Sequence, residues 1–382
     1  MGKKRLQYAL VIPVVLCCIL SFQPIAHAGA EKTLLIGLAT PLSGLGADWG
    51  RMQKEGAELG IEEINSKGGV RGYKFAVDIQ DDKADPKEAA TVAKLFSSNK
   101  NIKVVIGHCT SPTSFAAAPI YQRARVPMLI SLASNPALPD QGDYIFQNST
   151  TQFDECPAVA RYAVKDLGAR RVALIYINDD WGSSVRDVLP KEVEKLGGKM
   201  AAIEAYAPGE IDFRNLLTKI AARKPDILFG AFHPAEAAQL IIQAKDMKIP
   251  FPVLLSSGAQ TYSFIRLAGP AAEGTVFATG FDPTDTDPFV QNFVKSFKAK
   301  FNNENPTLFS SYVYDSIYLI ATAVRNIKGD VTRKKLRDAL ANLKEITTTA
   351  GVLSCEPNGH FGPRRIVTVI VKNKTFVFDK AL

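Results

Sequence analysis

Apolar and β-branched residues occur in short runs from Thr33 onward, and amphipathic segments separate the runs. In the first part of the chain this pattern predicts strands at Leu34–Ala39, Phe75–Ile79, Val104–Ile106 and Met128–Ile130. Between two of these strands, four apolar residues fall at the i, i+3, i+4 and i+7 positions of a helix: Ala89, Val92, Ala93 and Phe96. An alternation of strands and helices predicts a parallel sheet.

A second series of the same kind begins after Asp154. Its predicted strands are Val172–Ile177, Ala201–Tyr206, Ile227–Phe232 and Phe251–Leu255. Asp212 is expected to cap a helix whose apolar face includes Leu216 and Ile220. The remaining predicted elements are helices at Pro288–Phe301, Phe309–Ile327 and Thr332–Leu340 and strands at Ile366–Val371 and Phe376–Phe378. Two sheets imply two α/β lobes, and a chain of 382 residues is long enough for both.

The N-terminal segment has the three parts of a secretory signal peptide. A basic start (Lys3, Lys4 and Arg5) precedes an apolar stretch from Tyr8 to Leu20, and the small residues Ala26 and Ala28 then flank His27 in an A-x-A pattern. About 13 apolar residues, interrupted by a proline, are too few for a membrane span, which needs about 20. We expect cleavage after residue 28 and a mature protein in an oxidising, exported compartment.

The charge of the chain argues against a nucleic-acid partner. The formal net charge is +8, and removal of the basic start lowers it to +5. No basic run remains, because acidic and basic residues alternate along the surface segments. A protein that follows a phosphate backbone needs its Lys and Arg residues on one face.

Two loops that follow predicted strands suit the binding of an anion. The first, GHCTSPTS at 107–114, places Ser111 as an N-cap and Pro112 at the first position of a helix. The second, SLASNPALP, occupies 131–139. Each loop alone is explained by helix capping. After neighbouring strands, however, the free N–H groups of both point to one edge of the sheet, where they predict an anion cradle.

Motifs for catalysis are weak or absent. Gly44, Gly46 and Gly50 resemble a dinucleotide-binding loop, but Pro41 interrupts the turn, and Asp81 follows Gly44 by 37 residues instead of about 20. The chain contains no G-x-x-x-x-G-K-[ST] loop and no G-x-S-x-G elbow. Three histidines stand in separate loops without metal-ligand spacing: His108, His233 and His360. We therefore expect no enzyme, metal site or cofactor.

Nine segments in order resemble the branched-chain amino-acid-binding proteins, which are type I periplasmic solute receptors of ABC importers. The segments are PLSGLGADWG (41–50), EINSKGGVRGYKF (63–75), DDKADP (81–86), VIGHCTSPTS (105–114), VPMLISLASNPAL (126–138), DDWG (179–182), IDFRNLL (211–217), LAGPAAEG (267–274) and YVYDS (312–316). The resemblance covers nearly the whole mature chain.

This resemblance implies two Rossmann-like lobes joined by a three-segment hinge that closes on a ligand. The crossings are expected near Asn148–Asp154, Thr279–Pro283 and Cys355–Gly362. After the signal peptide at 1–28, lobe 1 would comprise 31–148 and 282–354, and lobe 2 would comprise 149–281 and 355–382.

The resemblance also implies the residues of the binding site. Ser111, Leu132 and Ser134 would bind the carboxylate of the ligand. Apolar contacts would come from Trp49, Trp181, Phe232 and Phe309. Because both tryptophans of the chain stand in D-W-G loops, we expect the two rings to face each other across the cleft and to favour a flat ligand.

One position departs from the family pattern. Amino-acid-binding members place a carboxylate against the ligand's ammonium group, and this chain has Ser257 at that position. A buried ammonium group without a counter-charge costs several kcal/mol. Asp48, Asp154 or Asp180 can substitute from another direction. We expect an aromatic carboxylate such as a benzoate or a phenylpropanoid acid, with branched-chain or aromatic amino acids as a close alternative.

The expected function is that of a monomeric, non-catalytic, periplasmic solute-binding protein that delivers a small hydrophobic carboxylate to an ABC permease in the inner membrane. An exported sensor domain that presents its ligand to a membrane receptor uses the same trap and stays open as an alternative. A dinucleotide-dependent exported enzyme is a more distant one.

The cysteines lead to a further expectation. In the family a disulfide can join the residue matching Cys109 to the one matching Ala84, so Cys109 should be a free thiol here. Cys156 and Cys355 each lie beside a predicted crossing. We expect these two to form a disulfide, since the chain is exported.

Overall fold

Five parallel strands form the first sheet, in the order β2-β1-β3-β4-β5. The computed structural model of the protein describes Gly2 and residues 32–382, so the predicted signal peptide lies, apart from Gly2, outside the described residues. The strands are β1 (Lys32–Thr40), β2 (Tyr73–Asp81), β3 (Ile102–Ile106), β4 (Met128–Ile130) and β5 (Ile145–Gln147). The parallel sheet predicted from the first series is therefore present, with β5 as an additional short strand.

Helices cover both faces of this sheet because its strands are apolar on both sides. Ile36 of β1 packs with residues of α1, α10 and α11, whereas Val105 of β3 packs with residues of α2 and α3. These helices are α1 (Ala47–Ser66), α2 (Pro86–Ser98), α3 (Ser111–Ala124), α10 (Leu308–Asn326) and α11 (Arg333–Ala341). The two faces have separate hydrophobic clusters, as a doubly wound α/β layer requires.

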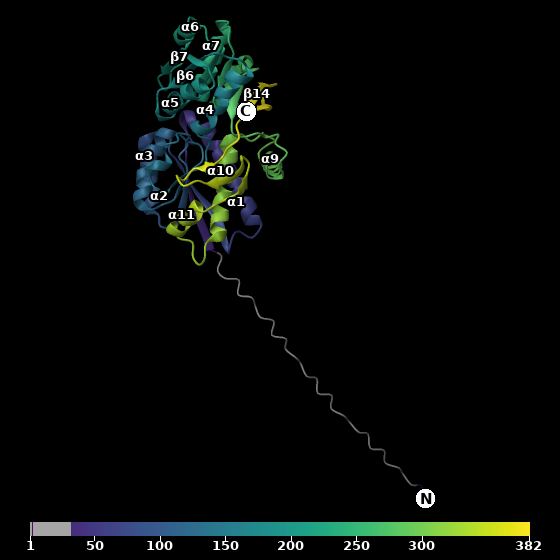
Figure 1. The fold of residues 1–382 in the computed structure, drawn as a ribbon. Coiled ribbons are helices and arrows are strands. Elements are labelled where there is room, and N and C mark those ends of the chain that lie inside the picture. Colours follow the sequence, from purple (N-terminus) through teal and green to yellow (C-terminus); the bar gives the residue numbers. More distant parts are fainter. Residues whose placement is uncertain (1, 3–31) are drawn as a thin grey trace. The chain divides into compact units, whose positions relative to one another are not determined.

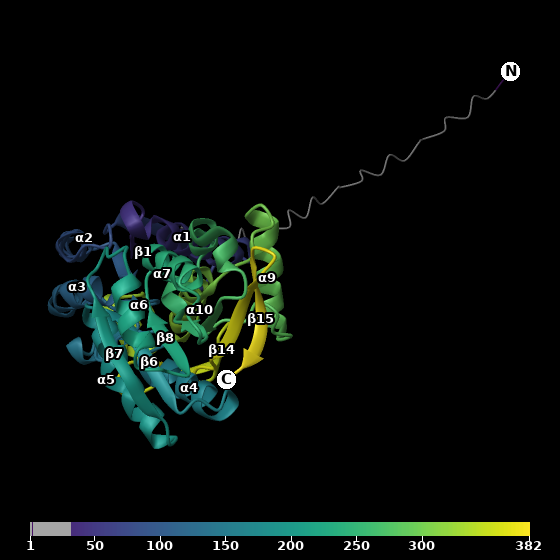
Figure 2. The same ribbon diagram turned by 90° about the horizontal axis from the view of Figure 1, so that it is seen from above.

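The second sheet has seven strands in the order β15-β14-β10-β9-β8-β6-β7. Its strands are β6 (Arg171–Ile177), β7 (Lys199–Tyr206), β8 (Ile227–Ala231), β9 (Val253–Leu255), β10 (Val276–Thr279), β14 (Val367–Lys372) and β15 (Thr375–Ala381). Only the pairings of β14, with β10 and β15, are antiparallel. Figure 2 shows β14 and β15 side by side at one edge. Each predicted strand is thus present in one of the two sheets, with its ends shifted by no more than three residues.

Five further helices belong to this second layer. They are α4 (Gln152–Arg161), α5 (Asp180–Lys195), α6 (Arg214–Ala221), α7 (Pro234–Asp246) and α8 (Tyr262–Ala268). The predicted cap of α6 is wrong by one residue, because Phe213 is the N-cap. Asp212 instead accepts a hydrogen bond from the N–H of Arg214 at 3.1 Å.

After β10 the chain returns to the first sheet. Helix α9 (Pro288–Lys300) leads to α10, which packs closely along α1: a Cβ at Gly56 would lie 2.1 Å from the carbonyl oxygen of Ser310. A small third sheet follows, with β11 (Ile346–Thr348), β12 (Gly351–Cys355) and β13 (Phe361–Gly362). Figure 1 shows α1, α2, α3, α10 and α11 in one half of the described chain and α4 to α7 in the other. These halves are the two lobes.

The chain passes between the lobes three times. The first passage follows β5, and the second follows β10. The third lies later than predicted, because Cys355 and Phe361 pack in the core of the first lobe. This passage therefore falls at 363–366, and residues 355–362 do not belong to the second lobe. The other two lobe boundaries, after residues 148 and 281, remain predictions.

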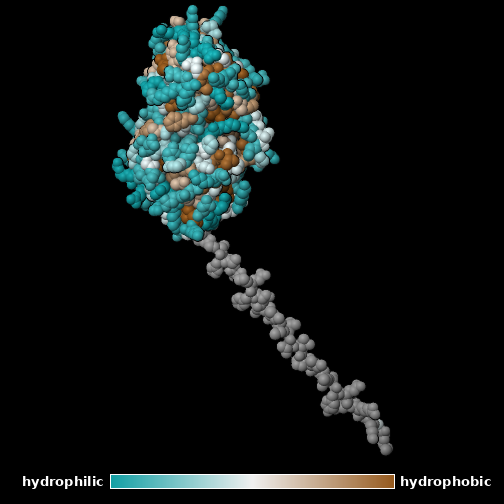
Figure 3. All heavy atoms as spheres, in the orientation of Figure 1, coloured by the Kyte–Doolittle hydropathy of each residue, from teal (hydrophilic) through white to brown (hydrophobic). Residues whose placement is uncertain are grey.

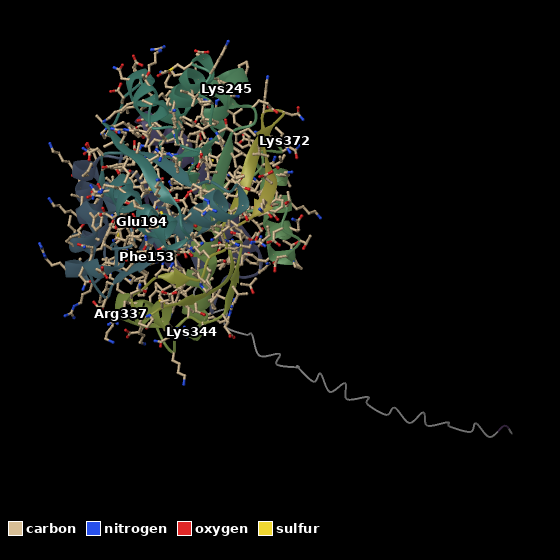
Figure 4. All side chains as sticks on the ribbon, turned by 45° about the horizontal axis from the view of Figure 1, so that its top comes forward. Phe153, Glu194, Lys245, Arg337, Lys344 and Lys372 are labelled. Atoms are coloured by element: carbon tan, nitrogen blue, oxygen red, sulfur yellow. The ribbon has the colours of Figure 1, made fainter. Side chains whose placement is uncertain are left out.

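Polar side chains dominate the surface. In the view of Figure 3 hydrophilic residues cover most of the described chain, and apolar residues are scattered among them. Figure 4 shows Lys245 and Lys372 toward one end and Arg337 and Lys344 toward the other, so these four basic side chains do not gather on one patch. No helix within 32–382 has the length and apolar content needed to span a membrane.

Candidate functional site

A cavity of about 580 Å³, including the part open to solvent, lies between the two lobes. Its walls follow the carboxyl ends of β3 and β4 in the first sheet and of β6, β8 and β9 in the second. This is the edge at which open α/β sheets bind ligands. The lining residues are Trp49, Cys109, Thr110, Ser111, Leu132, Ala133, Ser134, Thr150, Asp179, Trp181, His233, Ser257, Gly258, Leu308, Phe309 and Tyr312. Seven of the eight predicted site residues are among them, and Phe232 is not.

One wall of the cavity consists of the two predicted anion-binding loops. Ser111 is the first residue of α3 and not its N-cap as predicted, because Thr110 caps the helix in a capping box with Thr113. The hydroxyl oxygen of Ser111 accepts a hydrogen bond from the N–H of Asn135 at 3.2 Å and so joins the loops. Within the described chain no acceptor faces the N–H groups of Ser111 and Ser134. The wall therefore offers two unpaired donors, and the one at Ser111 lies at the N-terminus of α3, which is a favourable place for an anion.

Aromatic rings form the apolar walls. Trp49 stacks on Phe309, with ring centroids 6.0 Å apart and an interplanar angle of 12°. Trp181 stacks on His233 at 5.4 Å and 3°. The edge contact between Trp49 and His233, with centroids 4.9 Å apart, brings the two lobes together. Among the described residues the two indoles have no ring contact with each other, so they do not face each other directly as predicted. The imidazole of His233 contacts both of them.

Phe232, predicted as an apolar wall, lies in the core of the second lobe. Its side chain is fully buried and stacks on Tyr206 with centroids 4.5 Å apart. His233, the next residue, lines the cavity instead. Pro234 at the first position of α7 makes His233 the N-cap residue of that helix. In the loop at Ser111 the signal is a polar residue that follows a strand and precedes a proline. The same signal is present at His233, which follows β8 and precedes Pro234.

Acidic residues reach the cavity in a different way from the one predicted. Ser257 lines the cavity, but Asp48, Asp154 and Asp180 do not. The carboxylate of Asp154 is occupied at the start of α4, where it accepts hydrogen bonds from the N–H and the hydroxyl of Thr151, both at 2.8 Å. The acid that does line the cavity is Asp179. Burial raises the pKa of its carboxyl, and the N–H of Gly182 opposes this shift by donating a hydrogen bond at 2.8 Å.

Gln152 connects both lobes behind the cavity. The side-chain amide of Gln152 forms hydrogen bonds with all its polar neighbours when its oxygen accepts from the indole N–H of Trp181 and from the hydroxyl of Ser134, each at 3.2 Å. In that orientation the amide nitrogen donates to the hydroxyl of Ser184 at 2.8 Å and to the carbonyl of Ser134. The first residue of α4 therefore holds one ring of the second lobe and one loop of the first in a common network.

His108 and His360 do not line the cavity. His108 is buried, and its Nδ1 lies 2.6 Å from Asp82 Oδ2. His360 lies 3.7 Å from Asp154, away from the cavity lining. Among residues 32–382 no three His, Cys, Asp or Glu side chains are arranged to hold a metal ion.

The predicted disulfide is wrong. Cys156 and Cys355 are both free thiols, because Cys156 is buried in the core of the second lobe and Cys355 in the core of the first. Cys109 is also a free thiol, as expected, and it lines the cavity.

Known proteins are similar to this chain over most of its length. A family model described as periplasmic binding protein matches residues 33–375. The Leu/Ile/Val-binding protein homolog 1 of Brucella suis is 30% identical over 339 residues, which are 88% of this chain and 90% of that protein.

Solved structures of substrate-binding proteins have the same fold. The branched-chain amino acid transporter substrate-binding protein LivJ of Streptococcus pneumoniae, in complex with isoleucine, superposes with a TM-score of 0.85 at 26% identity and covers 92% of this chain and 99% of its own. A solute-binding protein of R. palustris in complex with benzoate has a TM-score of 0.82 at 21% identity, with coverages of 92% and 96%. The chain belongs to the Leu/Ile/Val-binding family of type I periplasmic binding proteins, whose members are substrate-binding components of ABC transporters and not enzymes.

Proposed function

We propose that this periplasmic binding protein captures a small hydrophobic carboxylate, with an aromatic acid as its preferred ligand, for an ABC permease. The observation that carries the proposal is the composition of one cavity. Ser111 and Ser134, whose N–H groups are unpaired within the described chain, line the same space as the rings of Trp49, Trp181 and Phe309. A carboxylate suits the first wall, and a flat apolar body suits the rings.

Ser257 supports the choice of an acid without an α-amino group. At this position the family's amino-acid receptors place a counter-charge for the ammonium group, and a serine hydroxyl has no charge to offer. A ligand without the ammonium group avoids the cost of burying it.

A branched-chain or aromatic amino acid is the second candidate, and Asp179 is the observation that favours it. Its carboxylate lines the cavity and is held at the N-terminus of α5. The Brucella suis relative, which matches 88% of this chain, bears the name of a Leu/Ile/Val-binding protein homolog, and the LivJ structure contains isoleucine.

Calorimetry on the purified protein, unfolded and refolded to remove bound ligand, tests the proposal. Benzoate, 4-hydroxybenzoate and cinnamate are compared with leucine, valine and phenylalanine. We expect the tightest binding from an aromatic acid. Benzamide is the matched control, because it keeps the ring and loses the anion, and it should not bind. Tight binding of leucine without binding of any aromatic acid would contradict the preferred ligand.

Export to the periplasm depends on the N-terminal segment. We infer that cleavage after Ala28 releases the mature protein. N-terminal sequencing of protein recovered from the periplasm tests this step, with residue 29 expected as the first.

A further inference from the structure

Two polar side chains in the cavity have no role in binding a carboxylate. Asp179 and His233 both line it from the second lobe, after β6 and β8. The carboxylate of Asp179 accepts hydrogen bonds from the backbone N–H groups of Gly182 and Trp181. Within the described chain no side chain donates to this carboxylate, and no hydrogen-bond partner contacts the imidazole nitrogens of His233.

Neither group is fully enclosed. Both side chains are partly exposed, and both line the cavity. A polar group that is mostly removed from water and lacks a partner loses free energy unless a ligand or a water molecule contacts it. The hydrogen-bonding capacity that Asp179 and His233 do not use within the protein is therefore available to a ligand in the cavity.

The electrostatic environment is consistent with this view. Burial raises the pKa of Asp179, and burial also lowers the pKa of His233 although the carboxylates of Glu236 and Asp179 oppose that second shift. At each of these two positions an unpaired charge is destabilised and a hydrogen bond to a ligand is stabilising.

We propose that Asp179 and His233 form a second polar end of the cavity, which binds an N–H or O–H donor that the ligand carries in addition to its carboxylate. An ionised carboxylate only accepts hydrogen bonds, and a neutral imidazole accepts one and donates one. The donor is therefore either a hydroxyl group on an aromatic ring or an ammonium group. This inference rests on the proposed function and narrows its ligand from a hydrophobic acid to a hydrophobic acid with a donor.

The first part of the test compares ligand pairs that differ only in the donor. In calorimetry with the wild-type protein, 3-hydroxybenzoate and 4-hydroxybenzoate are compared with benzoate, and phenylalanine is compared with 3-phenylpropanoate. We expect at least one donor-bearing ligand to bind about tenfold or more tightly than its parent. The pair that shows the preference identifies the donor as a hydroxyl or as an ammonium group.

The second part removes the acceptor. Asp179→Asn keeps a good N-cap for α5 and loses the charge. It should reduce the preference for the donor by about tenfold while the parent acid binds as tightly as before or more tightly. Asp180→Asn is the matched control, because Asp180 is exposed and does not line the cavity, and it should leave the preference unchanged. His233→Phe keeps a ring against Trp181, loses both nitrogens, and should also reduce the preference.

The outcomes separate the two proposals. If no carboxylate binds, the proposed function is wrong. If parent acids bind as tightly as all their donor-bearing analogues, or if Asp179→Asn weakens parent and analogue by the same factor, only the second polar end is wrong.

Discussion

The backbone N–H of Ser257 donates a hydrogen bond to Oε1 of Glu155 at 3.3 Å. The position at which the resemblance implies an acid therefore has a serine whose main chain contacts a carboxylate from α4. Glu155 is only 3% exposed, and it lies behind the cavity without lining it. Burial raises its pKa to about 7, with a further contribution from the charge of Asp154. A buried group that titrates near neutral pH thus lies directly behind the binding site.

Replacing this group should change how stability depends on pH. The pKa of Glu155 is about 7 in the folded protein, against 4.5 as its ordinary value. Between these values the unfolded chain ionises first, so the free energy of unfolding falls as the pH rises and stays lowered above pH 7, by about 3 kcal/mol. Glu155→Gln keeps an acceptor for Ser257 and cannot ionise. It should match the wild type near pH 4 and be more stable by up to about 3 kcal/mol at pH 8.

Urea unfolding between pH 4 and pH 8 measures this difference. Glu194→Gln is the control, because Glu194 is exposed on α5 (Figure 4), and its curve should follow the wild type. Burial raises the pKa of Asp315 to about 6. The free energy of unfolding therefore keeps some dependence on pH in all three proteins. Parallel curves for wild type and Glu155→Gln would show that Glu155 does not titrate in this range.

Substitution of Trp181 should affect ligand binding, whereas substitution of Phe232 should affect the stability of the fold. Trp181→Ala removes a cavity ring that stacks on His233, and it should weaken binding of the preferred carboxylate by about 1–3 kcal/mol. Phe232→Leu lies in the core, so it should lower the free energy of unfolding by about 1–2 kcal/mol and leave the Kd nearly unchanged. Calorimetry and urea unfolding of both variants check this, and a loss of affinity in Phe232→Leu equal to that in Trp181→Ala would contradict the assignment of the two rings.

The sequence was informative where a physical signal is local. Long apolar runs such as Val172–Ile177 are buried strands, and the period of Ala89, Val92, Ala93 and Phe96 is that of α2. The strands that were not predicted, β5, β10, β11, β12 and β13, have two to five residues each, and a period of two is hard to recognise in so few residues. Length alone does not decide this, because β4 has three residues and was predicted from its apolar run. The place of α10 in the first lobe was expected from the family resemblance and not from a pattern in α10 itself; in the structure Ser310 of α10 lies directly against Gly56 of α1.

The candidate site was predicted to within one residue in places where a loop leaves a strand. Phe232 and His233 are adjacent, and the end of β8 at Ala231 decides which of them faces the cavity. Glu155 was missed because its place behind Ser257 results from the contact of two lobe-2 segments 102 residues apart. The disulfide was predicted from nearness to the hinge, and it fails because burial of Cys156 and Cys355 in different cores is a tertiary property.

Thiol titration should find three free sulfhydryls in unfolded, unreduced protein that lacks residues 1–28. These are Cys109, Cys156 and Cys355, and all three are buried. The folded protein should react slowly, because burial raises the pKa of every one of them, that of Cys355 to about 11. A reduced sample serves as the control and should give the same number. One thiol before reduction and three after it would restore the pairing of Cys156 with Cys355.

Closure of the cleft should depend on a hydrogen bond between the lobes. Nδ2 of Asn135, beside the loop of Ser134, donates to the carbonyl oxygen of Asp180 at 2.7 Å. The same side chain accepts from the N–H of Ala137 at 3.0 Å. Asn135→Asp keeps that acceptor and replaces the donor by an oxygen that repels the carbonyl. The variant therefore changes the contact between the lobes and leaves the loop intact.

We expect Asn135→Asp to weaken ligand binding by about 1–2 kcal/mol, mainly through faster dissociation, because the lost bond belongs to the state in which the lobes meet over the ligand. Calorimetry gives the Kd, and stopped-flow measurement of tryptophan fluorescence gives the rate of release, since Trp49 and Trp181 line the cavity. Asn101→Asp introduces the same change at an exposed turn and should bind as the wild type does. Equal Kd values and release rates for both variants would mean that this bond does not contribute to closure.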